Sequence, residues 1–103
     1  MIAAPAAEAL SVLIVTRDRP AALARLLASL AAQQPGPAEV LVLDNAADVP
    51  LEAAMLPEAT QLLPLRLVRS DLFLGVAEAR RRLCEAAGLP IALLLDDDAW
   101  LTR

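Results

Sequence analysis

The sequence predicts an α/β domain with a doubly wound, mainly parallel four-stranded sheet flanked by helices. Two observations lead to this fold class. Short apolar runs alternate along the chain with amphipathic helical patterns, which is the order of elements that builds a parallel sheet. Hydrophobic residues also make up 58% of the 103 residues, and many are alanine or leucine, which suits helices packed on a buried sheet. A chain of this length forms one small domain or part of a larger one.

The first strand is predicted over Ser11–Val15, a continuous apolar run of the kind that is buried on both faces of a parallel sheet. A turn over Thr16–Pro20 follows, in which Asp18 or its neighbour caps a helix and Pro20 lies in the first helical turn. The helix carries one apolar stripe with helical spacing, made of Leu23, Leu26, Leu27 and Leu30.

The second strand is predicted over Glu39–Leu43, and the chain leaves it through Asp44 and Asn45. Prolines divide the next stretch, which we interpret as a surface connection with one short helix near residues 51–56.

The third strand is predicted over Leu65–Arg69. It should lie near a sheet edge because arginines alternate with its apolar residues. Gly75 then precedes a helix over Val76–Ala87, and the fourth strand follows over Ile91–Leu95.

Composition excludes several classes of protein. The formal net charge is −4 and every basic residue is arginine, which argues against nucleic-acid binding. Cys84 is the only cysteine, so no intrachain disulfide and no cysteine metal site are expected. The absence of histidine excludes histidine-dependent catalytic triads. We find no basic signal region and no apolar stretch approaching a span of roughly 20 residues, so we expect a cytoplasmic protein without a transmembrane segment.

Polar segments follow three of the predicted strands directly. In doubly wound sheets, ligands bind in the crevice outside the carboxyl ends of the strands. This rule places Thr16 with Arg17, Asp44 with Asn45, and the acidic triplet Asp96–Asp98 along one edge of the sheet. Segments that are distant in the sequence are therefore expected to be neighbours.

The triplet Asp96–Asp98 directly follows the last apolar run. Three adjacent carboxylates repel one another, and a hard divalent cation with oxygen ligands would explain them. A solvated turn at the strand end is the alternative, because aspartate is also favoured there. Asp44 and Asn45 could likewise form only an Asx turn, and Thr16–Arg19 only a helix cap. The residues alone leave both interpretations open.

The first turn excludes two common nucleotide-binding classes. A Rossmann domain would carry Gly-x-Gly-x-x-Gly there, and a P-loop enzyme would carry Gly-x-x-x-x-Gly-Lys-Ser/Thr. This chain has Thr16-Arg17-Asp18-Arg19-Pro20, without glycine or lysine.

Four segments together resemble the nucleotide-binding half of a family 2-like glycosyltransferase with the GT-A fold. The resemblance covers most of the chain, from about Leu10 to Leu101. Its landmarks occur in the family's order and are Ser11–Pro20, Val40–Asn45, Gly75–Arg80 and Leu93–Leu101, the last with the Asp-x-Asp motif.

The resemblance implies glycosyl transfer from a nucleoside-diphosphate sugar to an unknown sugar, lipid or protein acceptor, with Mg²⁺ or Mn²⁺. It implies metal binding by Asp98 and Asp96, with Asp96 also facing the ribose or sugar. The substrate-binding residues that it implies are Thr16, Arg17, Asp44, Asn45, Gly75, Arg80, Asp96 and Asp97.

The same resemblance sets the expected domain organisation. We expect an N-terminal tail over residues 1–9 and a donor-binding half over 10–103, with the acceptor half absent and the general base beyond residue 103. Such a chain should lack transferase activity alone, and an exposed sheet edge should make it self-associate. The alternatives are a non-catalytic nucleotide-binding module and a purely structural α/β module.

Overall fold

The computed structural model describes residues 9–102. Its elements are β1 (Leu10–Thr16), α2 (Pro20–Ala31), β2 (Glu39–Asn45), the 3₁₀ turns η1 (Ala53–Met55) and η2 (Glu58–Leu62), β3 (Leu65–Ser70), α3 (Val76–Ala86) and β4 (Ile91–Asp96).

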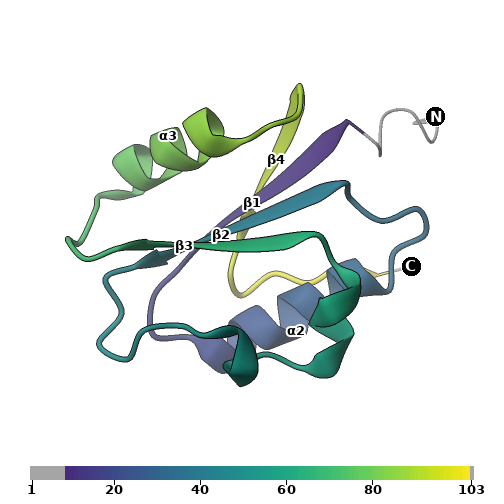
Figure 1. The fold of residues 1–103 in the computed structure, drawn as a ribbon, viewed down its shortest axis with the longest axis horizontal. Coiled ribbons are helices and arrows are strands. Elements are labelled where there is room, and N and C mark those ends of the chain that lie inside the picture. Colours follow the sequence, from purple (N-terminus) through teal and green to yellow (C-terminus); the bar gives the residue numbers. More distant parts are fainter. Residues whose placement is uncertain (1–8, 103) are drawn as a thin grey trace.

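The four strands form one sheet in the order β3-β2-β1-β4, and every pair is parallel. Helices α2 and α3 lie on opposite faces of this sheet (Figure 1). The predicted fold class is therefore confirmed, and so is the position of β3 at an edge of the sheet.

The core consists of two layers because alternate residues of β1 and β2 point to opposite faces. One layer joins the two strands to the predicted leucine stripe of α2 and contains Val12, Ile14, Leu23, Leu26, Leu27, Leu30, Val40 and Val42. The other joins them to α3 and contains Leu13, Leu41, Leu43, Leu74, Ala79 and Leu83. In β1 and β2 the continuous apolar run thus marks a strand covered on both faces.

The connection between β2 and β3 differs from the prediction of one short helix. It contains two 3₁₀ turns, Ala53–Met55 and Glu58–Leu62, separated by the extended residues Leu56 and Pro57. Proline lacks an amide hydrogen and fixes its own φ angle, so Pro57 stops the first turn from growing into a longer helix.

Strand β4 is the second edge of the sheet in the described part of the chain, since it pairs only with β1. Its apolar side chains belong to neither core layer and are exposed: Ile91 by 45%, Leu93 by 40% and Leu94 by 41%. Among residues 9–102, neither helix has the length and apolar character needed to cross a membrane.

Candidate functional site at the carboxyl ends of the strands

The parallel pairing brings the predicted polar segments together. Thr16 lies opposite Asp44 in the register of β1 and β2, and Val15 lies opposite Asp96 in the register of β1 and β4. On the far side of β2, Asp44 lies opposite Arg69 of β3. All four strands therefore end at one edge, where the sequence places its charged residues.

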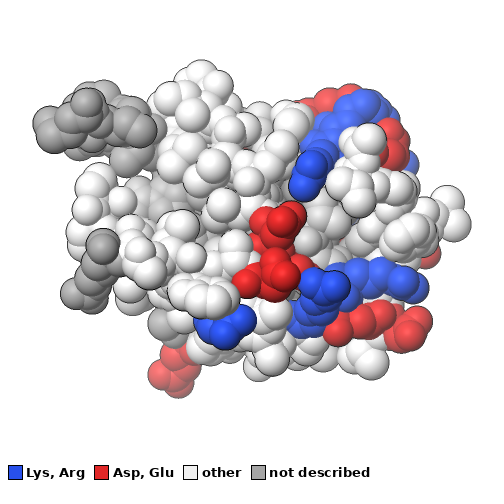
Figure 2. Space-filling view, turned by 180° about the vertical axis from the view of Figure 1, so that it is seen from behind, with Lys and Arg blue, Asp and Glu red and all other residues white. Residues whose placement is uncertain are grey.

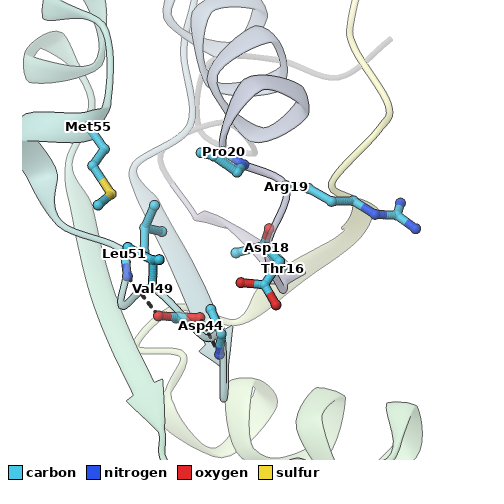
Figure 3. Close-up of a pocket in the computed structure, with 9 residues that line it drawn as sticks. Thr16, Asp18, Arg19, Pro20, Asp44, Val49, Leu51 and Met55 are labelled. Atoms are coloured by element: carbon cyan, nitrogen blue, oxygen red, sulfur yellow. Dashed lines mark hydrogen bonds between the residues drawn. The ribbon is translucent and has the colours of Figure 1, made fainter.

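A pocket of about 330 Å³ opens at this edge, on the side of α2 (Figure 3). Its lining combines polar strand ends with an apolar wall and consists of Thr16, Asp18, Arg19, Pro20, Asp44, Ala47, Val49, Leu51 and Met55. Figure 3 shows the guanidinium of Arg19 pointing away from the other lining residues. Pockets with apolar walls and a few placed polar groups are typical of small-molecule sites.

Asp44 lies at the base of this pocket with its side chain only 4% exposed. Its Oδ1 accepts a hydrogen bond from the amide of Ala47 at 3.3 Å, and its Oδ2 accepts one from the amide of Leu51 at 2.9 Å (Figure 3). Arg69 Nη1 donates a further bond to Oδ2 at 2.8 Å. This buried carboxylate is therefore both charge-paired and fixed in orientation.

Asn45, the next residue, holds a different loop. Its Nδ2 donates to the carbonyl oxygen of Leu74 at 2.9 Å, and its Oδ1 accepts from the amide of Leu74 at 2.8 Å. This pair of bonds fixes the loop directly before Gly75, the N-cap residue of α3. A Cβ at Gly75 would meet nothing within 4 Å, so no steric constraint in the described chain requires glycine there.

The acidic triplet forms a turn. Strand β4 ends at Asp96, and the amide of Ala99 donates to the carbonyl oxygen of Asp96 at 3.1 Å, so the chain reverses at Asp97 and Asp98. Asp97 and Asp98 therefore do not continue the extended strand.

Asp97 is the buried member of the triplet, with a side chain 10% exposed. Its Oδ2 accepts the hydroxyl hydrogen of Thr16 at 3.0 Å, and its Oδ1 accepts a bond from Arg19 Nη1 at 3.2 Å. Asp96 and Asp98 are exposed. We call the segment Asp96–Ala99 the acid turn, and two of its three carboxylates face solvent.

Two further predicted residues, Arg80 and Arg17, lie at this edge with different contacts. Arg80 of α3 lies 3.5 Å from Asp96 as an exposed ion pair. Arg17 Nε donates to the carbonyl oxygen of Ala46 at 3.4 Å, and its guanidinium stacks over the ring of Phe73 at 4.9 Å. Figure 2 shows acidic side chains in the middle of one face of the molecule, with basic side chains on either side.

A metal cage made by the protein alone is absent from the described part of the chain, where no three histidine, cysteine, aspartate or glutamate side chains are grouped to hold an ion. The exposed carboxylates of Asp96 and Asp98 fit a different kind of site. Mg²⁺ is often bound by only one or two carboxylates, together with water and the phosphates of a substrate.

Sequence reasoning missed several contributors to this site, among them the apolar wall of Val49, Leu51 and Met55. Arg69 is the partner of Asp44, although its place at the end of β3 was a visible signal. Arg19 is the partner of Asp97. Ala46 adopts a left-handed backbone with φ of 55°, which is uncommon for a residue other than glycine. Alanine at this position does not predict a left-handed backbone.

These features define an α/β domain that presents buried and exposed acids around a pocket at the carboxyl edge of a parallel sheet. The family model described as "Glycosyl transferase family 2" matches residues 11–103, and the chain belongs to this family.

The fold is also similar to that of a solved structure, residues 1–349 of TarS from S. aureus. The TM-score is 0.73 at 22% sequence identity, over 88% of this chain and 28% of that chain. The chain therefore spans well under half of that structure. No curated protein matches this chain by sequence.

Proposed function

We propose that this domain binds a nucleoside-diphosphate sugar for glycosyl transfer, with a divalent metal held at the acid turn. The observation that carries the proposal is the convergence of Thr16, Asp44 and the acid turn at one sheet edge, beside a pocket of about 330 Å³. These segments come from three different strands. A structural turn at one strand end would not require polar groups at the other two.

In this proposal the base of the donor occupies the pocket against the apolar wall of Val49, Leu51 and Met55. Asp44 accepts a hydrogen bond from the base edge. Thr16 is the last residue of β1 and lines the pocket, and Arg17 follows it and stacks over Phe73, so both would flank the nucleotide. Asn45 acts indirectly, by fixing the loop that leads to Gly75.

The diphosphate would lie toward the acid turn, where Asp96 and Asp98 would hold Mg²⁺ or Mn²⁺. When bound, such an ion supplies positive charge to phosphate oxygens that become more negative as the sugar leaves. Asp97 has both oxygens engaged by Thr16 and Arg19, so we assign it to positioning the turn. Arg80 lies beside Asp96 and can supply a second positive charge to the leaving diphosphate.

None of the residues that we assign to this site is given the role of general base. The isolated chain should therefore bind a donor without transferring its sugar, and robust metal-dependent transfer by the 103-residue chain would refute this expectation.

Self-association belongs to the same proposal. Strand β4 carries three exposed apolar side chains, and its outer backbone edge is unpaired in the described chain; unpaired strand edges readily pair with another chain. We expect the isolated chain to associate through this edge.

Calorimetric titration with UDP, GDP, CDP and ADP, with and without Mn²⁺, tests the proposal. We expect binding that requires the metal and that weakens at least ~10-fold in the double variant Asp96→Asn with Asp98→Asn, because charged ligands are lost. Glu58→Gln is the matched control, since it removes an exposed carboxylate on η2. Metal-independent binding would favour a non-catalytic nucleotide module, and no binding would leave a structural α/β module.

A further inference from the structure

The carboxylate of Asp44 has little hydrogen-bonding capacity left. A carboxylate offers about four lone-pair positions, two on each oxygen. The amide of Leu51 and the guanidinium of Arg69 occupy both positions on Oδ2, and the amide of Ala47 occupies one on Oδ1. One acceptor position therefore remains, on Oδ1 of a side chain that lines the pocket.

The guanidinium of Arg69 donates three hydrogen bonds around Asp44. Besides its bond to Asp44, its Nη2 donates to the carbonyl oxygen of Ala47 at 3.1 Å, and its Nε donates to Asp71 Oδ1 at 2.8 Å. The hydrogen bond to Asp71, followed by the bond to Asp44, raises the pKa of Arg69 above its usual value. The guanidinium is planar and rigid, so these three bonds fix its orientation.

The backbone bond to Ala47 extends this control to the pocket wall. Ala47 belongs to the loop after β2 that also supplies Val49 and Leu51 to the pocket. Arg69 therefore holds the carboxylate and the loop beside it with a single side chain. The side chain of Arg69 is 34% exposed, whereas that of Asp44 is 4% exposed. Arg69 is therefore partly hydrated, and Asp44 is almost completely shielded from water.

We propose that Arg69 is a positioning residue that sets the base specificity of the pocket, by turning the negatively charged Asp44 so that its last acceptor position faces the base. This inference rests on the function proposed above. The carboxylate has no proton to donate, so it favours bases whose ring nitrogen carries hydrogen, such as uracil and guanine.

Cytosine and adenine present a bare ring nitrogen at the corresponding edge. Their exocyclic amino groups could still donate to Asp44, but the ring nitrogen would then face a carboxylate with no compensating donor. An acceptor that lacks a donor in a buried site costs binding free energy. The pocket should therefore bind cytosine and adenine more weakly than uracil and guanine.

The test is calorimetric titration of the 103-residue chain with UDP, GDP, CDP and ADP in the presence of Mn²⁺. We expect UDP or GDP to bind at least ~10-fold tighter than CDP and ADP. Arg69→Met should weaken the preferred nucleotide by about 10-fold, because a charge-assisted bond to Asp44 is lost, and should reduce the preference to about 3-fold or less. Arg69→Lys keeps the charge but not the fork, so it should restore part of the preference.

Arg66→Met is the matched control. Arg66 lies on the same strand and also bonds a backbone oxygen, that of Ala86 at 3.0 Å, but it does not line the pocket. This variant should keep the wild-type preference. Circular dichroism checks that each variant is folded, and if Arg69→Met does not fold, Arg69→Lys carries the test with an expected loss of preference of about 3-fold.

The outcomes separate the two proposals. If the wild type binds no nucleotide, the proposed function fails and this inference falls with it. If the wild type binds with a base preference that folded Arg69 variants retain, the function stands and the inference is wrong. A wild type that binds all four nucleotides equally also overturns the inference.

Discussion

Thr16→Val tests whether the acid turn is held by the bond between Thr16 and Asp97. Valine has nearly the same shape as threonine but lacks the hydroxyl that donates to Asp97 Oδ2 at 3.0 Å. Both residues are buried: over the whole residue, Thr16 is 5% and Asp97 is 7% exposed. Water therefore cannot easily replace the lost donor. A hydrogen bond to a charged group contributes about 1.5–3 kcal/mol, and we expect Thr16→Val to lower the free energy of unfolding by that amount.

The second donor to Asp97 should contribute much less. Arg19 is 60% exposed, and exposed ion pairs contribute about 0.2–1 kcal/mol. Arg19→Met should therefore destabilise the chain by less than Thr16→Val does. Thr16→Ser keeps the hydroxyl and loses one methyl group, which costs about 0.8 kcal/mol, so it should also be milder than Thr16→Val.

Urea unfolding, followed by the fluorescence of the single tryptophan Trp100, measures these differences. A double-mutant cycle isolates the bond. In an Asp97→Ala background, Thr16→Val should lower the free energy of unfolding by less than about 0.5 kcal/mol, because the carboxylate that accepts the Thr16 hydroxyl is already absent. If Thr16→Val costs the same in both backgrounds, the bond does not stabilise the acid turn and the reasoning is refuted.

Three further predictions concern the rest of the molecule. Ala46→Gly should raise the free energy of unfolding by up to about 1 kcal/mol, because φ of 55° is unfavourable for alanine; Ala46→Val should lower it, and an unchanged urea midpoint in both would contradict the backbone argument. The pKa of Glu78 is lowered to about 2, mainly by hydrogen bonds from Arg81, and that of Glu39 is lowered mainly by the amide of Gly88. Glu78 therefore stabilises the fold fully above pH 4.5 and loses this contribution as pH falls toward 2, and Glu39 likewise loses its contribution as pH falls through its lowered pKa; Glu78→Gln should make the loss of stability in acid shallower in titrations followed by circular dichroism, and an unchanged acid unfolding curve would count against it. Leu93→Lys, which places a charge on the open edge of β4, should give a monomer by light scattering at concentrations where the wild-type chain associates, whereas monomeric wild type at high concentration would exclude the edge as a contact.

Much of the fold could be predicted because its signals are local. The apolar runs of β1 and β2 and the leucine stripe of α2 report burial through their periodicity alone. The rule for parallel sheets then placed Thr16 and Asp44 at one edge, and the observed register confirms that they are neighbours.

The parts that could not be predicted depend on contacts between distant side chains. Three identical residues stand in the acidic triplet, and which of them is buried depends on where β4 ends and on the position of Thr16. The pairing of Arg69 with Asp44 depends on which strand lies beside β2, and strand order is not a local property of the sequence.

The acid turn connects the stability of β4 with the proposed donor site. Within the described chain, β4 pairs only with β1, so its carboxyl end depends on the bonds of Asp97 to Thr16 and Arg19. The same bonds determine where Asp96 and Asp98 are presented. Loss of Asp97 should therefore weaken metal-dependent nucleotide binding although its own oxygens are already engaged, and Thr16→Val should weaken it in proportion to the destabilisation that it causes. A variant that loses the bond and keeps its metal-dependent affinity would show that bound donor, rather than the free protein, arranges the two exposed acids.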